Sequence, residues 1–142
     1  MVTVQKIYDA AIDLMDEQDE TTGATKTRDT REYEVRTISI LNIALPVLYP
    51  YSSNCDRSLP GRPTPAPLLA DNRSEPDFTQ EIPLDDALCW ALLPFWLASL
   101  LRSGEDTEFS MRMMTEYNNA LASIRDLVPA EFEAISTPYG LF

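Results

Sequence analysis

The sequence predicts an all-α protein, a small helical bundle of about four helices with a long proline-rich loop or arm and an extended C-terminal tail. Apolar residues recur at spacings of three and four in four segments, which is the period of a helix with one buried face. A length of 142 residues with 44% hydrophobic side chains suits one domain with its own core. We therefore expect residues 1–142 to form a single helical domain.

The first helix is expected to begin after Thr3, whose hydroxyl can accept from the free amides of the first turn. Its buried stripe is predicted to consist of Val4, Ile7, Ala11, Leu14 and Met15. The helix ends in the stretch DEQDETTGATKT, whose composition is that of a polar linker.

The second helix is expected to begin near Asp29 or Thr30. Its predicted apolar face consists of Tyr33, Ile38, Leu41, Ala44, Leu45 and Leu48. Pro46 is expected to kink or end this helix, because proline lacks the backbone donor and clashes with the preceding turn.

Residues 49–83 form a proline-rich segment with no sustained periodicity. A segment of this length without helix or strand is unusual in a compact domain and is typically functional or disordered. Its apolar residues Leu59, Leu68, Leu69 and Phe78 need a surface to pack against. We interpret it as an arm or lid that lies on its own domain or on a neighbour, and a flexible linker is the alternative.

The third helix is expected to begin near Leu84, with Asp85 and Asp86 in the first turn, where the helix dipole favours carboxylates. Residues 88–101 then run for fourteen positions without a charge. Because a bilayer span needs about 20 apolar residues, this run predicts a buried helix and no membrane anchor. Apolar residues on every side predict a place at the centre of the bundle, or cover from other subunits. Pro94 predicts a kink, and Ser103–Gly104 is expected to cap the helix.

The fourth helix is expected to be capped by Glu105, Asp106 and Thr107. Its apolar positions are Phe109, Met113, Met114, Tyr117, Ala120, Leu121, Ile124 and Leu127. The short connection SGED makes the third and fourth helices antiparallel neighbours. The tail 128–142 carries aromatic residues near its end, and either docks on another protein or folds back on its own core.

The charge balance excludes several classes of partner. With 23 Asp and Glu against 11 Lys and Arg, the net charge is -12, which repels nucleic-acid phosphates and anionic lipids.

The N-terminal residues lack the pattern of a signal peptide, so we expect a protein made in a reducing cytoplasm. Cys55 and Cys89 have no partner residues for a zinc site, and a disulfide between them stays open.

The chain offers little for catalysis or cofactor binding. It has no histidine, the commonest general base, and no glycine-rich phosphate loop. Asp13, Asp16, Glu17 and Glu20 have a spacing that a helical metal site could use, but a solvated acidic face is the favoured interpretation. Helical nucleotide pyrophosphohydrolases need an ExxE pair followed closely by ExxD, and the pairs Glu17/Glu20 and Glu105/Glu108 do not meet this pattern. We expect no catalytic residue, no metal and no cofactor.

One combination of features resembles a known family. Residues Ile82–Asp86 read IPLDD, an apolar helix with the step Leu93–Pro94 follows, then the turn Gly104–Asp106 and a helix with the central Tyr117. This pattern, over residues 30 to 127, is similar to the head–tail connector, or head-completion adaptor, proteins of tailed bacteriophages. Phe95–Trp96 departs from it, because smaller residues are expected after the proline.

The resemblance implies a structural virion protein at the head–tail interface, made in the host cytoplasm. Its subunits would form a homo-oligomeric ring below the portal protein and provide the docking surface for tail or head-completion proteins. DNA would pass through the channel without sequence-specific binding, for which an acidic wall is suited. The alternative is a non-enzymatic acidic protein-binding module, an inhibitor or chaperone acting as a monomer or dimer. The candidate partner-interface residues are Leu68, Leu69, Phe78, Tyr139, Leu141 and Phe142.

Overall fold

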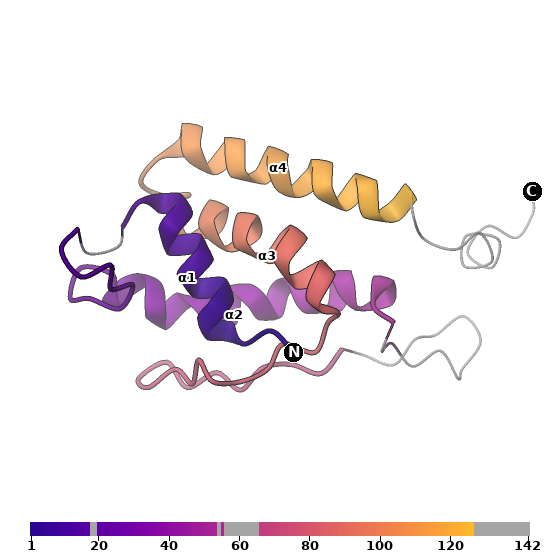
Figure 1. Cartoon of the computed structure of the whole chain (residues 1–142), viewed down its shortest axis with the longest axis horizontal. Coiled ribbons are helices and arrows are strands. Elements are labelled where there is room, and N and C mark those ends of the chain that lie inside the picture. The colour runs from indigo at the N-terminus through magenta and orange to yellow at the C-terminus, as the bar shows by residue number, and fades with distance from the viewer. Residues whose placement is uncertain (18–19, 54, 56–65, 127–142) are drawn as a thin grey trace, which may run out of the picture.

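The computed structural model describes residues 1–17, 20–53, 55 and 66–126, and its described part is a bundle of helices (Figure 1). In chain order the elements are α1 (Val4–Met15), α2 (Arg31–Leu48), the short 3-10 helix η1 (Tyr49–Tyr51), α3 (Asp86–Leu101) and α4 (Thr107–Asp126). Extended pairing among the described residues is limited to one isolated bridge between Thr3 and Glu81. The predicted all-α class is confirmed.

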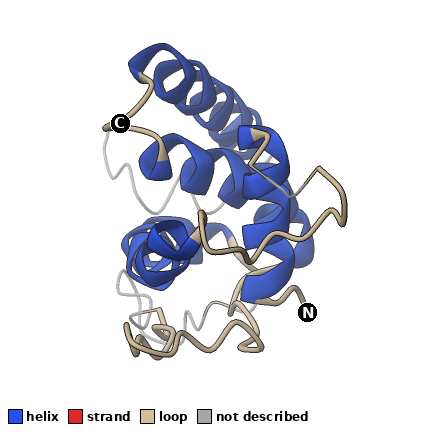
Figure 2. Ribbon diagram, turned by 90° about the vertical axis from the view of Figure 1, so that its left-hand side faces the viewer, coloured by secondary structure: helices blue, strands red, loops and turns tan. Residues whose placement is uncertain are grey.

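Helix α3 is the central element. It packs against α1, α2 and α4, and α4 lies on the side of α3 away from the segment 66–83 (Figures 1 and 2). Leu92, Leu93 and Leu97 of α3 are fully buried. The all-round apolar sequence thus has its expected physical reason, since this helix meets neighbours on several sides. Its first turn begins at Asp86, with Asp85 as the N-cap.

Helices α3 and α4 form the predicted antiparallel hairpin (Figure 1). The Asp106 carboxylate accepts from the Phe109 amide at 3.0 Å and so caps α4. Near the turn that joins the two helices, the hydroxyls of Ser99 and Ser110 each donate to the other residue's carbonyl, at 2.8 and 2.9 Å. The predicted cap at Ser103–Gly104 is wrong by one residue, because α3 ends with Arg102 in the C-cap position.

Helix α1 begins as predicted, with the Thr3 hydroxyl accepting from the Lys6 amide. Its buried stripe differs from the prediction at one position. Leu14 is 39% exposed, whereas Tyr8 and Ile12 are fully buried because α1 turns a wider face toward the core. The helix ends at Asp16, whose φ of 57° lies in the left-handed region that aspartate tolerates better than most residues.

Helix α2 has Thr30 as its N-cap residue, and all six residues of its predicted apolar face are buried. The expectation that Pro46 ends the helix is wrong, since α2 continues to Leu48 and η1 follows directly. Pro46 lies on the exposed surface in the last turn, so the proline ring does not disturb the core.

Residues 66–83 of the proline-rich segment lie against the helices of their own chain. The Asn42 side chain accepts from the Leu69 amide at 2.8 Å and donates to the Leu69 carbonyl at 3.0 Å. The Gln80 side chain makes the same pair of hydrogen bonds to Ala70, at 2.7 and 2.8 Å. The Phe78 and Gln80 carbonyls accept from the first amides of α1, and the Ile82 amide donates to Val2. Two side-chain amides and the N-terminal strand-like residues therefore hold this segment in place.

The polar linker after α1 is folded by threonines where it is described. The Thr30 hydroxyl accepts from the Thr27 amide and donates to the Thr25 carbonyl, at 2.8 and 2.9 Å. The buried Tyr8 hydroxyl also donates to the Thr25 carbonyl, at 2.9 Å. Composition indicated a linker, and these hydrogen bonds attach it to α1 and to the start of α2.

Among the described helices, none is both long and apolar enough to cross a membrane. Cys55 and Cys89 are both buried and are not joined in a disulfide. Burial raises the pKa of the Cys89 thiol to about 12. Cys89 is therefore a small core residue, as its position in the apolar run predicted.

Candidate interaction surface

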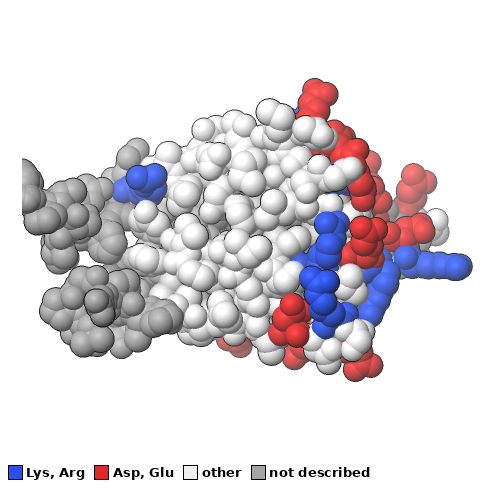
Figure 3. Space-filling model, turned by 180° about the vertical axis from the view of Figure 1, so that it is seen from behind, with Lys and Arg blue, Asp and Glu red and all other residues white. Residues whose placement is uncertain are grey.

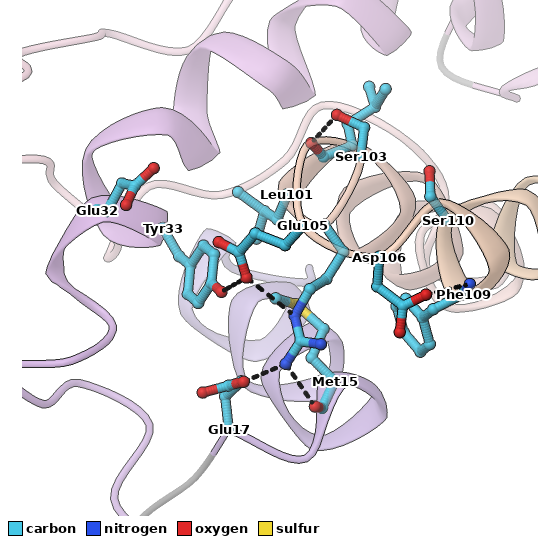
Figure 4. A network of polar contacts seen from close by, with 12 residues as sticks. Met15, Glu17, Glu32, Tyr33, Leu101, Ser103, Glu105, Asp106, Phe109 and Ser110 are labelled. Carbon is cyan, nitrogen blue, oxygen red and sulfur yellow. Dashed lines mark hydrogen bonds and ion pairs between the residues drawn. The ribbon is translucent and has the colours of Figure 1, made fainter.

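The ends of three helices meet in a polar junction around Arg102. The Arg102 Nη2 atom donates to the Met15 carbonyl at 3.1 Å and forms an ion pair with Glu17. Its Nε atom lies 3.7 Å from the Glu105 carboxylate. Figure 4 shows Glu17, Met15 and Glu105 on different sides of this contact. A cation against the last carbonyls of α1 is favourable, because that end of a helix carries partial negative charge.

Helix α2 enters the same junction through two side chains. The Tyr33 hydroxyl donates to the Glu105 carboxylate at 2.7 Å, and Arg36 donates to the Leu101 carbonyl at 2.9 Å. Burial, together with the hydrogen bond to Glu105, raises the pKa of Tyr33 to about 12. The junction therefore fixes how α1, α2 and α3 meet and where α4 begins.

The carboxylates of this junction are occupied by Arg102 and Tyr33, which leaves them unsuited to metal binding. Within the described ranges, no group of three or more Cys, Asp or Glu residues is arranged to hold a metal ion. The predicted solvated acidic face is wrong for Glu17, because its carboxylate reaches Arg102 instead of pointing into solvent. Asp13 and Asp16 lie on the exposed surface as expected.

In contrast to the polar junction around Arg102, another part of the surface is a broad area without charged side chains. In Figure 3 most Lys, Arg, Asp and Glu side chains gather toward one end of the molecule, one Lys or Arg lies at the opposite end beside the grey residues, and the middle of that face is white. The sequence accounts for this, because residues 37–53, 87–101 and 117–124 contain no charged side chain. Three helices thus present uncharged stretches side by side.

The uncharged area can be followed along one stripe of α2. Residues 36, 40, 43 and 47 lie on one side of a helix. At the junction end, Arg36 contacts α3, and next to it the Ile40 carbonyl accepts from the Trp96 indole at 3.1 Å. Beyond this point the stripe emerges from the core, since Ile43 is 61% and Val47 is 56% exposed.

Aromatic rings connect α3 to α4, and one of them, Trp96, is bonded to α2 through the Ile40 carbonyl. The rings of Trp96 and Tyr117 lie 5.1 Å apart in a tilted arrangement. Burial raises the pKa of Tyr117, and Tyr51 is close enough to contribute to this shift. We define the uncharged face by the residues Ile43, Val47, Tyr51, Trp96 and Tyr117. It offers apolar contact area and no electrostatic barrier to a partner.

The predicted interface residues differ in their exposure to solvent. Leu68 is 63% exposed, whereas Leu69 and Phe78 are buried against the core of their own domain. The Phe78 ring packs against the Tyr8 ring in a tilted arrangement with centroids 5.0 Å apart, and the Lys26 ammonium lies 4.3 Å from the Phe78 centroid. Of these three residues, Leu68 alone presents its side chain to solvent in this conformation. Tyr139, Leu141 and Phe142 lie outside the described residues.

Sequence reasoning missed Ile43, Val47 and Arg102. The signal for the first two was the long uncharged stretch after Arg36, in which Ile43 and Val47 are four residues apart but outside the stripe assigned to the core. For Arg102 no local signal exists. Its partners Met15 and Glu17 precede it by more than 80 positions, so only the fold brings them together.

Comparisons with protein-family models, with curated proteins and with solved structures give no match for this chain. A functional assignment therefore depends on the sequence pattern and on the surfaces described above.

Proposed function

We propose that this chain is a structural subunit of a tailed-phage virion, a head–tail connector that assembles as a ring below the portal and receives tail or head-completion proteins. The observation that carries the proposal is the separation of the surface into a charged end and an uncharged face (Figure 3). A ring subunit needs both, because it must contact a neighbour on either side while another part of its surface faces the channel.

The uncharged face supports a role in contact with other proteins. Exposed apolar side chains that adjoin aromatic rings are enriched in the cores of interfaces, where charged residues are depleted. Ile43 and Val47 are such exposed side chains, and they follow Ile40, whose carbonyl accepts from the Trp96 indole. The strongly acidic composition supports the channel part of the proposal, since a surface of net charge -12 does not hold DNA that slides past it.

The rigidity of the bundle also supports a structural role. The junction around Arg102 and the Ser99–Ser110 pair fix α1, α2 and α4 relative to the central helix. A subunit that transmits contact from one ring neighbour to the next requires such fixed geometry. No step in this proposal is catalytic, and none requires a metal or cofactor.

The test is electron microscopy of purified portal mixed with this protein. An additional ring below the portal supports the connector, and a portal without added density contradicts it. A matched variant lacking Tyr139–Phe142 should remain folded by circular dichroism and add a weaker ring or none. Unchanged ring formation by this variant would remove the docking role of the tail. A stable dimer that never joins the portal would instead favour the alternative, an inhibitor or chaperone.

A further inference from the structure

We infer that the uncharged face binds residues 127–142 of a second copy of this chain. The inference rests on the proposed ring and names the contact between its subunits. It follows from three features: the apolar side chains that a single copy leaves in water, the charge of the rest of the molecule, and the composition and starting point of the segment 127–142.

The face itself has the properties of a binding surface. The stripe of α2 is covered at Arg36 and Ile40, and it is uncovered at Ile43, three residues after Ile40, and at Val47, four residues further on. Trp96 keeps its indole donor satisfied by the Ile40 carbonyl, so the area beside it makes no demand for a polar partner. An apolar segment can therefore cover Ile43, Val47 and the Trp96 ring without leaving the indole N–H unpaired.

Electrostatics favours this face for contact between copies. Two molecules of net charge -12 repel one another, and most orientations would bring carboxylates opposite carboxylates. The uncharged face removes that barrier on one side of the contact. In the segment 127–142, Glu131 and Glu133 are both negative, but residues 134–142 carry no charged side chain and so add no side-chain repulsion on the other side.

The segment also has suitable side chains and a suitable origin. Its apolar residues are Leu127, Val128, Phe132, Ile135, Tyr139, Leu141 and Phe142. It follows Asp126, the last residue of α4, and this end of α4 lies at the end of the molecule remote from the turn between α3 and α4 (Figure 1). Sixteen residues span up to about 50 Å when extended, which is enough to reach across a neighbouring subunit.

A second copy suits this segment better than its own face does. To run along α2 from Val47 toward Ile43 in the same chain, the segment would have to turn back, because α2 and α4 end at the same end of the molecule (Figure 1). A head-to-tail neighbour receives it in the direction in which α4 points, and such heterologous contacts close into rings. The arrangement makes each copy both donor and acceptor of one segment.

Disulfide cross-linking between two tagged versions of the full chain tests this directly. Both carry Cys55→Ser and Cys89→Ala, one has Val47→Cys and the other Tyr139→Cys, and they are mixed under oxidation with and without purified portal. We expect a disulfide between differently tagged copies. The matched control replaces Glu108 by cysteine, an exposed position at the charged end, and should give at least tenfold less product.

Two other outcomes would overturn the inference. A single chain carrying both Val47→Cys and Tyr139→Cys that closes its own disulfide when dilute would assign the face to its own segment. Absence of cross-linking both with and without portal would remove the contact altogether, while an added ring in electron microscopy would leave the connector proposal standing. Conversely, cross-linked copies without a portal ring would support this contact and contradict the connector.

A second set of variants avoids cysteine chemistry. Ile43→Ser with Val47→Ser changes only exposed side chains, so the fold should persist by circular dichroism. We expect sedimentation to show self-association at least tenfold weaker than that of the control Leu68→Ser, which removes an equally exposed side chain outside this face. Equal association of the two variants would contradict the inference.

Discussion

Replacing Arg102 by methionine should destabilise the whole bundle, because this side chain joins residues that are far apart in the sequence. It is 16% exposed and reaches the Met15 carbonyl, the Glu17 carboxylate and the Glu105 carboxylate. Methionine keeps much of the aliphatic contact of arginine, so the substitution isolates the polar interactions.

The magnitude can be estimated from the contacts that are lost. A hydrogen bond from a charged donor contributes about 1.5–3 kcal/mol, which applies to the Met15 carbonyl. The ion pair with Glu17 adds roughly 1 kcal/mol at most, because Glu17 is 33% exposed and water screens it. We therefore expect Arg102→Met to lower the free energy of unfolding by about 3 kcal/mol. For a chain of this size the melting temperature should fall by about 6–12 °C.

Urea unfolding followed by circular dichroism measures this loss. The matched control is Lys6→Met, an exposed cation near the start of α1, whose effect should stay within about 0.5 kcal/mol. A cycle with Glu17→Gln should give a coupling energy of about 1 kcal/mol between Arg102 and Glu17. If Arg102→Met changes stability no more than Lys6→Met does, the junction does not hold the helices together.

Three further predictions concern the arm, the start of α3 and the buried thiol. Asn42→Ala should lower the free energy of unfolding by about 2 kcal/mol in urea titrations, because both hydrogen bonds to Leu69 are lost. A loss below about 0.5 kcal/mol would mean that this clamp is not needed. Hydrogen bonds from the backbone and side chain of Ser53 lower the pKa of the Asp85 carboxyl group. The ionised Asp85 therefore adds to the free energy of unfolding at pH values above the ordinary carboxyl pKa of about 4, and this contribution is lost as pH falls through the lowered pKa. The stability difference between wild type and Asp85→Asn, from urea titrations at several pH values, should therefore be largest near neutral pH and shrink toward pH 3, and a constant difference would contradict this. Cys89 should react with iodoacetamide at pH 8.5 only as fast as the protein unfolds, and rapid labelling of the folded protein in mass spectra would contradict its burial.

The elements of this fold were predictable because their signals are local. The cap at Thr3, the apolar positions of α2 and the uncharged run of α3 each depend on residues within a few turns of one another. The exposure of Leu14 was not predictable in this way, because its spacing fits the stripe and only the orientation of α1 against α3 decides which edge is covered. Pro46 shows the same limit, since an exposed position in the last turn accommodates a proline that the pattern alone would place at a helix end.

The candidate surface was harder to predict than the fold. Leu69 and Phe78 were predicted as partner contacts because they are apolar residues in a proline-rich segment. The structure buries both, and the hydrogen bonds of Asn42 and Gln80 explain why this segment lies on its own domain. These contacts join residues that are 10 and 27 positions apart, and the periodicity of apolar residues in the sequence does not predict such contacts.

The distribution of charge links the stability of this fold to its proposed use. The buried helix α3 needs cover, and α1, α2 and α4 provide it with apolar faces, while the arginines 36 and 102 satisfy helix ends at one place. Because ionic contacts are collected at that end, the rest of α2 after Arg36 and residues 117–124 of α4 can stay uncharged without loss of stability. An acidic protein built in this way keeps its repulsive charges away from one face. A neighbouring subunit can then contact that face without electrostatic repulsion. Identical acidic subunits need such a face if they are to form a ring.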